Sequence, residues 1–235
     1  MPTKFIRKKN RLPDKQIYKS KNSFFVTICV NERKCIFPET VIDRYYFNDD
    51  YIKNAERSPL QVYHLDKIVE NAWLDLPNIF ENIVLDQYVV MPNHFHGIIT
   101  FLEVPKSKFT GKESDLGKII KRFKLESLRK IVQTVTDGHY NTKDQNTGNF
   151  KFLQGLGLHG LHGLHERSVI ASTGYLIRIY KTVWQKSFYD HVIRGEKDLQ
   201  RIQEYIFNNP LKWNLDILNV NNEDKYQKWR LRALG

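Results

Sequence analysis

The chain has 235 residues, of which 41% are hydrophobic and 13% are aromatic. That composition can build a core, which excludes a wholly disordered protein. The longest apolar runs, such as residues 24–30, are too short to cross a bilayer, and the basic N-terminus lacks the apolar stretch of a secretory signal. Only Cys29 and Cys35 are present, which excludes a disulfide framework and a four-cysteine zinc site. We therefore expect a reduced cytoplasmic protein with no membrane partner.

The charge of the chain is concentrated in two segments. Lys and Arg number 37 against 26 Asp and Glu, which gives a net charge of +11. Residues 1–21 hold eight basic residues and one acidic residue, and residues 106–130 hold nine and three. Basic patches of this kind suit phosphate binding, because neutralised phosphates release their counterions. General solubility is the alternative explanation of the charge, but the two separate patches favour nucleic acid as the partner.

The first half of the chain predicts a basic arm followed by strands and one helix. Residues 1–22 form the arm, and residues 23–30 are rich in aromatic and β-branched residues, as in a buried strand. Residues 60–80 carry apolar side chains at helical spacing, with a break near Pro77. Residues 83–90 and 95–102 predict two strands. The turn residues Met91-Pro92-Asn93 between them predict a hairpin.

The second half predicts two helices, a strand and a low-complexity insertion. Residues 116–132 form a basic amphipathic pattern, residues 183–193 predict a strand, and residues 196–208 predict a helix that Pro210 ends. Between them, residues 136–181 are polar or Gly-rich and repeat Gly-Leu-His. The repeat could bind metal, but a period of three fits no regular ligand face, so we interpret it as a loop. Its histidines are His159, His162 and His165.

These elements predict one α+β domain over residues 23–210, followed by a C-terminal tail over residues 211–235. An antiparallel sheet with helices on one face is the economical way to pack them. A ferredoxin-like core, similar to that of an RNA-recognition motif, fits the order of strands and helices best.

Two short motifs could carry chemistry. His94 and His96 flank Phe95, so a strand would point both imidazoles to one face, where they can bind a cation. Surface or hydrogen-bonded histidines are the alternative for so short a motif. Tyr205 and Asn209 are four residues apart, so a helix puts both on one side. A phenol can act as a nucleophile and an amide oxygen suits a hard cation, whereas a helix-edge tyrosine and an asparagine cap are the structural alternative.

The run Met91-Pro92-Asn93-His94-Phe95-His96-Gly97 resembles the signature of the single-tyrosine HUH transposases. Several other segments are similar to the REP-associated branch of that family, and they occur in the same order. They are Arg11-Leu12-Pro13, residues 24–30 with Arg33, Phe123-Lys124, residues 183–194, and Tyr205-Ile206 followed by Asn209-Pro210. The resemblance covers about residues 11–213, apart from the unfamiliar stretch between about 136 and 181.

The resemblance implies the HUH transposase fold and an enzyme that cleaves and rejoins single-stranded DNA. His94, His96 and Asn209 would bind Mg²⁺ or Mn²⁺, and Tyr205 would form a 5′-phosphotyrosine intermediate. The DNA would be a hairpin of a REP-like palindrome, in the nucleoid of the cytoplasm, and the protein would act as a monomer or homodimer. We expect the DNA contacts to come from the two basic segments and from the end of the strand over residues 183–193. These residues are Arg7, Lys8, Lys9, Arg11, Lys118, Lys121, Arg122, Lys124 and Arg194.

Two other functions stay open at this point. A non-catalytic nucleic-acid-binding module like an RNA-recognition motif would explain the charge and the aromatic residues, but not the two chemical motifs. A domesticated descendant that nicks DNA or regulates would keep the motifs without moving an element. Tyr189 is a second tyrosine near the expected site, and we interpret it as a packing residue. His191 could contact phosphate together with Arg194, or it could pair with Asp190.

Overall fold

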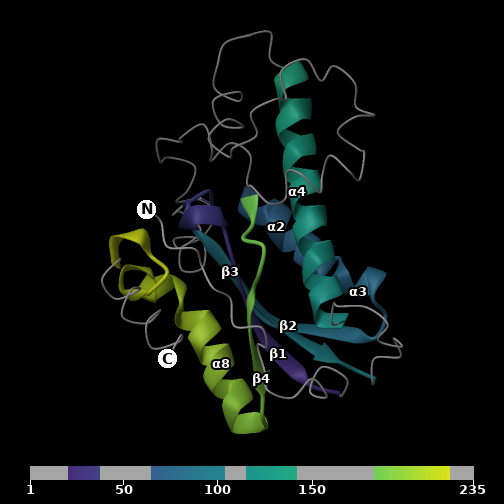
Figure 1. Cartoon of the computed structure of the whole chain (residues 1–235), viewed down its shortest axis with the longest axis vertical. Helices are drawn as coiled ribbons and strands as arrows, with labels where there is room; N and C mark the ends of the chain where they lie inside the picture. Colours follow the sequence, from purple (N-terminus) through teal and green to yellow (C-terminus); the bar gives the residue numbers. More distant parts are fainter. Residues whose placement is uncertain (1–20, 38–64, 104–114, 142–182, 223–235) are drawn as a thin grey trace, which may run out of the picture.

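The computed structural model describes residues 21–37, 65–103, 115–141 and 183–222 (Figure 1). In these ranges four strands form one antiparallel sheet in the order β2-β3-β1-β4. Their bounds are Ser23–Cys29 for β1, Ile83–Met91 for β2, His94–Phe101 for β3 and Tyr189–Ile193 for β4. The expected α+β class with an antiparallel sheet is confirmed.

The β2–β3 hairpin has the turn that the sequence predicts. Met91 pairs with His94, so only Pro92 and Asn93 connect the two strands. The turn is held from outside the hairpin by the chain that leaves β1. Val30 N–H donates to the Asn93 carbonyl at 2.8 Å, and Phe37 N–H donates to the Pro92 carbonyl at 3.1 Å. The end of the hairpin is therefore fixed at the point where the His-x-His motif begins.

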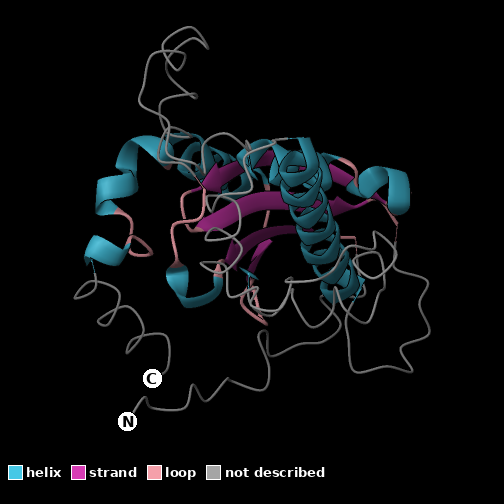
Figure 2. Ribbon diagram, turned by 90° about the horizontal axis from the view of Figure 1, so that it is seen from above, coloured by secondary structure: helices cyan, strands magenta, loops and turns pink. Residues whose placement is uncertain are grey.

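One face of the sheet is covered by α2 (Leu65–Leu74), α3 (Leu76–Ile79) and α4 (Asp115–Asn141). Leu65, Val69 and Trp73 of α2 recur every four residues and face the sheet, as a helical period requires. Figure 2 shows α4, the long helix, lying against the strands. The core of this layer holds large apolar side chains from both helices and from alternate positions of the strands. Among them are Phe24, Val26, Ile28, Phe95, Ile99, Leu116, Ile120 and Phe123.

The other face of the sheet is covered by α8 (Glu196–Asn208), which corrects the expectation of helices on one face only. Ile202 and Ile206 of α8 pack with residues of β2 and β3, including Met91 and Ile98. The reason lies in the strand alternation of β3. Because successive side chains point to opposite faces, the set that includes Ile98 lies opposite the Phe95 set and needs a second apolar cover.

Two predicted elements have different lengths in the structure. The strand expected over residues 183–193 is formed only by β4, although Trp184 makes an isolated bridge to Val30. The ammonium of Lys124 donates hydrogen bonds to the carbonyls of Gln185 and Ser187, at 2.7 and 2.9 Å. These carbonyls bind a side chain instead of a neighbouring strand, which accounts for the shorter β4. In contrast, α4 continues past the expected residue 132 to Asn141. Helical hydrogen bonding propagates easily once a helix is established, and the polar residues there are tolerated.

The chain after α8 packs back onto the sheet. It forms two short 3-10 helices, η5 (Pro210–Leu215) and η6 (Val220–Asn222), and it buries Trp213 and Leu218. Most of the predicted basic arm, the Gly-Leu-His repeat with its histidines, and residues 223–235 lie outside the described residues. In the described part of the chain, no helix combines the length and the apolar character needed to cross a bilayer.

Gly97 of β3 gives a test of this packing. A Cβ atom at this position would lie 2.5 Å from Cζ2 of Trp73 and 2.9 Å from Cε1 of Phe95. We expect Gly97→Ala to lower the free energy of unfolding by about 1–3 kcal/mol, measured by urea denaturation, because the core is overpacked.

The matched control for this substitution is the background variant Trp73→Phe, which removes the overlapping ring. In that background Gly97→Ala should cost less, so the two substitutions should be non-additive. Equal costs in the two backgrounds would show that Trp73 does not set the requirement for glycine.

Candidate active site

His94 and His96 form a buried pair on the α8 side of β3. Their exposed fractions are 0% and 2%, and the Nε2 atoms lie 3.0 Å apart. Alternation along the strand puts both rings on one face, as the sequence predicts. The predicted pair is therefore brought together, and it lies inside the protein rather than on the surface.

Asn93 fixes the tautomer of His94. Its Nδ2 donates to the carbonyls of Leu218 and Arg33, at 2.8 and 3.2 Å, so its Oδ1 is the atom that faces His94 Nδ1 at 2.8 Å. An amide oxygen only accepts, so Nδ1 of His94 must carry the proton. The Nε2 atom of the neutral ring then presents a lone pair toward His96.

Thr27 of β1 holds the second imidazole. Its Oγ1 lies 2.9 Å from Nδ1 of His96, and a hydroxyl can either donate to that nitrogen or accept from it. If Nδ1–H of His96 donates to Thr27, both Nε2 lone pairs face each other, and a cation can satisfy both. If Thr27 donates instead, Nε2–H of His96 can donate to His94. The pair is thus compatible with both a cation-bound and a cation-free state.

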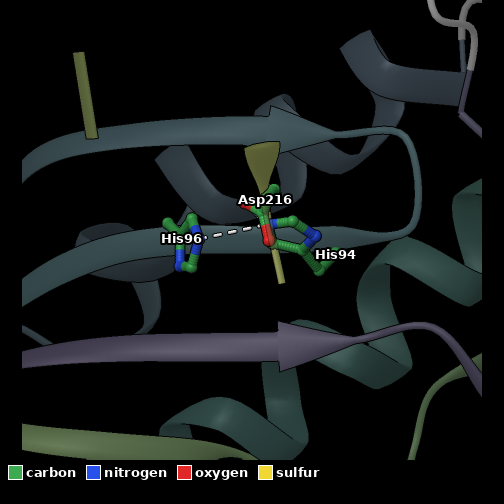
Figure 3. Close-up of side chains that lie close together, drawn as sticks. All are labelled: His94, His96 and Asp216. Carbon is green, nitrogen blue, oxygen red and sulfur yellow. Dashed lines mark hydrogen bonds and ion pairs between the residues drawn. The ribbon is translucent and has the colours of Figure 1, made fainter. Parts of the chain in front are cut away.

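A third group, Asp216, approaches the pair from the segment after α8. Its Oδ2 lies 3.8 Å from Nε2 of His94, and Figure 3 shows the carboxylate beside the two imidazoles. One ligand atom from each of the three residues lies within 4.8 Å of the others. Bonds of about 2.1 Å to a shared ion place its ligand atoms roughly 3 to 4 Å apart. The distances from Nε2 of His94 to Nε2 of His96 and to Oδ2 of Asp216, 3.0 and 3.8 Å, lie in that range, so these donors fit a divalent cation. In the described part of the chain, no other group of His, Cys, Asp or Glu side chains converges in this way.

Asn209 lies at the C-terminal cap of α8, one helical turn after Tyr205. Its side chain is 3% exposed, and neither amide atom has a hydrogen-bond partner within the standard geometric limits. A buried amide without partners costs free energy, which a ligand can recover. The resemblance implies that Asn209 is a metal ligand, and a buried amide with both atoms unpaired is compatible with that role.

Tyr205 lies at the edge of the site. Its Oη is 3.5 Å from Nε2 of His96, and its ring meets Phe25 edge-on with a centroid distance of 5.9 Å. Phe25 also stacks on His96 at 5.2 Å. The Tyr205 side chain is 44% exposed, so the phenol is held next to the buried imidazoles and can still be reached from solvent.

The environment of the site disfavours the charged form of each of these groups. Burial lowers the pKa of His96 to about 3, and burial together with the neighbouring imidazole lowers the pKa of His94 well below its usual value. Burial and the charge of Asp216 raise the pKa of Tyr205 to about 12, against a smaller opposing effect of Asn209. Burial also raises the pKa of Asp216. A bound cation supplies positive charge, which would lower the pKa values of Tyr205 and Asp216 and so oppose the effect of burial.

The residues predicted to contact DNA are distributed over both sides of the sheet. Lys118, Lys121 and Arg122 are exposed on α4, which covers the face opposite the histidine pair. Lys118 and Arg122 also form ion pairs with Asp115 and Glu126. Arg194 is exposed in the connection between β4 and α8. The residues Arg7, Lys8, Lys9 and Arg11 lie outside the described residues.

Lys124 corrects the predicted set of DNA contacts. Its side chain is 2% exposed, and its ammonium binds two backbone carbonyls beneath the surface. It therefore holds the chain before β4 and does not face a phosphate. His191 pairs with Asp198 of α8 at 2.9 Å rather than with Asp190, while its contact with phosphate stays a prediction. The cysteines behave as simple strand and loop residues, with Cys29 buried and Cys35 exposed.

Asp216 and Asn93 are the site residues that the sequence did not single out. Asp216 follows α8 in a stretch of mixed polar and apolar residues with no motif, and only tertiary packing brings it to His94. Asn93 is adjacent to the His-x-His motif and belongs to the run that resembles the HUH signature, but its own predicted role was only that of a turn residue. Asn93 immediately precedes the candidate ligand His94, and that position could have indicated its role. The ring nitrogen of a metal-binding histidine that does not bind the metal commonly donates a hydrogen bond to a nearby acceptor.

No protein-family model matches the chain. An uncharacterized protein of Haemophilus influenzae is 26% identical over 216 residues, which cover 86% of this chain and 88% of that protein. Among solved structures, the chain is similar to a REP-associated tyrosine transposase bound to a REP hairpin, at 17% identity and a TM-score of 0.39. That match covers 82% of this chain and 68% of the other. A likeness this distant assigns neither a substrate nor a mechanism.

The buried histidines predict that the protein loses stability in acid. Their pKa values are lower in the folded chain than in the unfolded chain, so the unfolded state binds more protons as the pH falls below about 6.5. The free energy of unfolding should then decrease by about 1.4 kcal/mol per pH unit for each such histidine. Urea denaturation in chelator at about pH 7 and about pH 5.5 measures this dependence.

The variant His96→Gln is the control for this prediction. It removes one titrating imidazole and keeps a polar side chain, so its stability should vary less steeply between the two pH values. The same dependence in both proteins would mean that His96 is not held neutral in the fold.

Proposed function

We propose that this protein is a metal-dependent transposase-type nuclease that cleaves and rejoins single-stranded DNA through Tyr205. The observation that carries the proposal is the position of the Tyr205 hydroxyl, 3.5 Å from Nε2 of His96 at the rim of a buried imidazole pair. A nucleophile and two neutral nitrogen ligands lie in one place, and the buried amide of Asn209 follows one helical turn after the nucleophile. This combination is what a phosphodiester transfer through a tyrosine requires.

In the proposed reaction, Oη of Tyr205 attacks the phosphorus of one DNA linkage. The new bond joins the phenol oxygen to the 5′-phosphate, and the bond from phosphorus to the 3′-oxygen breaks. The phenol gives up its proton, and the departing oxygen takes up a proton to become a free 3′-hydroxyl. The phosphotyrosine link keeps the energy of the phosphodiester, so attack by a 3′-hydroxyl reseals a strand without ATP. When bound by His94, His96 and Asn209, Mg²⁺ or Mn²⁺ would polarise the phosphate, lower the pKa of the phenol and stabilise the leaving oxygen.

The residues around Tyr205 have definable roles in this proposal. Phe25 supports the phenol ring from its edge and stacks on His96, so it fixes the two rings relative to each other. Asn93 holds His94 so that Nε2 is its available nitrogen, and Thr27 does the same for His96 when its hydroxyl accepts from Nδ1–H. DNA in the form of a hairpin is the proposed partner, and the net charge of +11 supports it.

A non-catalytic module like an RNA-recognition motif fits the described fold less well. Such modules stack bases on aromatic side chains across an open sheet face. In this chain, α8 packs against the corresponding face and covers it with Ile202 and Ile206. A sheet covered on both faces has no such platform, so the chemistry at the edge of α8 is the better-supported function.

Tyr205→Phe tests the nucleophile. The substitution removes only the phenolic oxygen and keeps the ring, so stability should change little. With single-stranded hairpin DNA from the flanks of the gene and Mn²⁺, we expect cleavage to fall on the order of 10⁴-fold or more and the covalent protein–DNA band to disappear from denaturing gels.

Tyr189→Phe is the matched control, because Tyr189 pairs with Thr27 on the neighbouring strand and also lies on the histidine side of the sheet. This variant should cleave like the unaltered protein. A covalent band that persists in Tyr205→Phe, or that peptide mapping assigns to Tyr189, would move the nucleophile from α8 to β4.

A second prediction separates metal chemistry from DNA binding. Replacing both His94 and His96 with Ala should abolish cleavage, because no other described group offers two neutral nitrogen ligands at this place. Binding of the hairpin in a gel-shift assay should be retained, since the proposed phosphate contacts lie on other residues. Cleavage at the unaltered rate in chelator-treated buffer with added Mg²⁺ would contradict the metal assignment.

A further inference from the structure

The two oxygens of the Asp216 carboxylate have different surroundings. Oδ1 accepts a hydrogen bond from Leu218 N–H at 2.6 Å, which closes a tight turn after η5. Oδ2 makes no hydrogen bond within the described residues, and its polar neighbour is Nε2 of His94 at 3.8 Å. The side chain is only 4% exposed. A buried carboxylate oxygen of this kind needs a positive partner or a proton.

The neighbour of Oδ2 cannot supply a hydrogen bond in its fixed tautomer. Because Asn93 Oδ1 accepts from Nδ1–H of His94, the Nε2 atom of the neutral ring has a lone pair. Two lone pairs, on Oδ2 and Nε2, therefore face each other, with the Nε2 atom of His96 beside them at 3.0 Å from His94. When Nδ1–H of His96 donates to Thr27, the Nε2 atom of His96 is an acceptor as well. Three acceptors then converge in a buried place, which is the arrangement that a cation stabilises.

Asp216 also belongs to a segment that is coupled to the histidines at a second point. We call residues 210–222 the C-terminal clasp. Its Leu218 carbonyl accepts from Asn93 Nδ2 at 2.8 Å, and the same Asn93 side chain holds His94. The ring of Trp213 lies 6.1 Å from the ring of His94. The clasp therefore meets the metal-binding strand through a carboxylate, a carbonyl and an indole.

We propose that Asp216 is a further ligand of the metal ion held by His94 and His96, and that metal binding fastens the C-terminal clasp to the sheet. This inference rests on the metal site of the proposed function. It adds to that site a negatively charged oxygen from outside α8. The coupling is reciprocal. If the docked clasp increases the affinity for the metal ion by a given free energy, the bound metal ion must stabilise the docked clasp by the same free energy.

The first measurement is Mn²⁺ binding by isothermal titration calorimetry without DNA. Asp216→Asn keeps an oxygen that can accept from Leu218 N–H, so the turn should be maintained while the charged ligand is lost. We expect it to weaken Mn²⁺ binding at least about tenfold. Asp86→Asn is the matched control. Asp86 also accepts from a backbone N–H, and its second oxygen accepts from Gln203 of α8, so the same charge is removed away from the histidines.

The second measurement is hydrogen exchange of the backbone amides of the clasp. In the unaltered protein, Mn²⁺ should slow exchange over residues 210–222, and in Asp216→Asn this protection should be lost. The measurement on the unaltered protein does not depend on any variant folding correctly. Exchange in α4, on the other side of the sheet, should respond less to Mn²⁺ and provides an internal reference.

The outcomes separate this inference from the metal site on which it rests. If Asp216→Asn binds Mn²⁺ like the unaltered protein while His94→Ala does not bind it, the role of Asp216 is overturned and the histidine site stands. If Mn²⁺ binds but leaves exchange in the clasp unchanged, the coupling is overturned. If the unaltered protein binds no Mn²⁺, both this inference and the metal assignment of the proposed function are wrong.

Discussion

The Asn93 side chain joins three parts of this protein that are distant in sequence. Its amide nitrogen binds the carbonyls of Arg33 and Leu218, which follow β1 and α8, and its oxygen binds the ring of His94. All of these groups are polar and most are buried, so each unmade hydrogen bond would cost about 1–3 kcal/mol. The amide also selects one tautomer of His94. The geometry of the candidate active site therefore depends on a residue of the hairpin turn that touches no proposed substrate.

The position of the site follows from the two-sided burial of β3. One set of its side chains, with Phe95 and Ile99, packs under α2 and α4, while the other set begins with His94 and His96 and continues to Ile98. Apolar contacts hold α8 over Ile98. The same helix then carries Tyr205 and Asn209 past the histidines, because Ile202, Tyr205, Ile206 and Asn209 follow one another at spacings of three and one. The residues of α8 that pack in the core and the residues proposed to act in the reaction therefore lie on the same side of the helix.

The separation of the site from the exposed basic residues of α4 constrains how DNA could bind. Lys118, Lys121 and Arg122 lie in the layer on the far side of the sheet from Tyr205. A hairpin that contacts both would have to pass around an edge of the sheet, where Arg194 lies next to the edge strand β4. Surface ion pairs on α4 also reduce the charge that two of these residues offer to phosphates.

The sequence by itself determined the elements whose patterns are local. Strand β1, the β2–β3 hairpin and α8 agree with alternation, turn residues and helical spacing, and the same patterns put the imidazoles on one strand face and Tyr205 with Asn209 on one helix side. These features depend on residues within about one or two turns of each other. The predictions failed where local pattern does not decide the outcome. The end of α4 depends on helical cooperativity, and the start of β4 depends on contacts of the distant Lys124.

Only the tertiary structure decided which groups meet. That α8 covers the second face of the sheet, that Lys124 is buried and that Asp216 reaches His94 all result from contacts between segments dozens of residues or more apart. No periodicity marks such contacts, because they depend on how whole layers pack and not on the spacing within one element. The sequence contains the proposed ligands and the proposed nucleophile, but the packing of α8 and of the segment after it brings Tyr205 and Asp216 to the buried histidine pair.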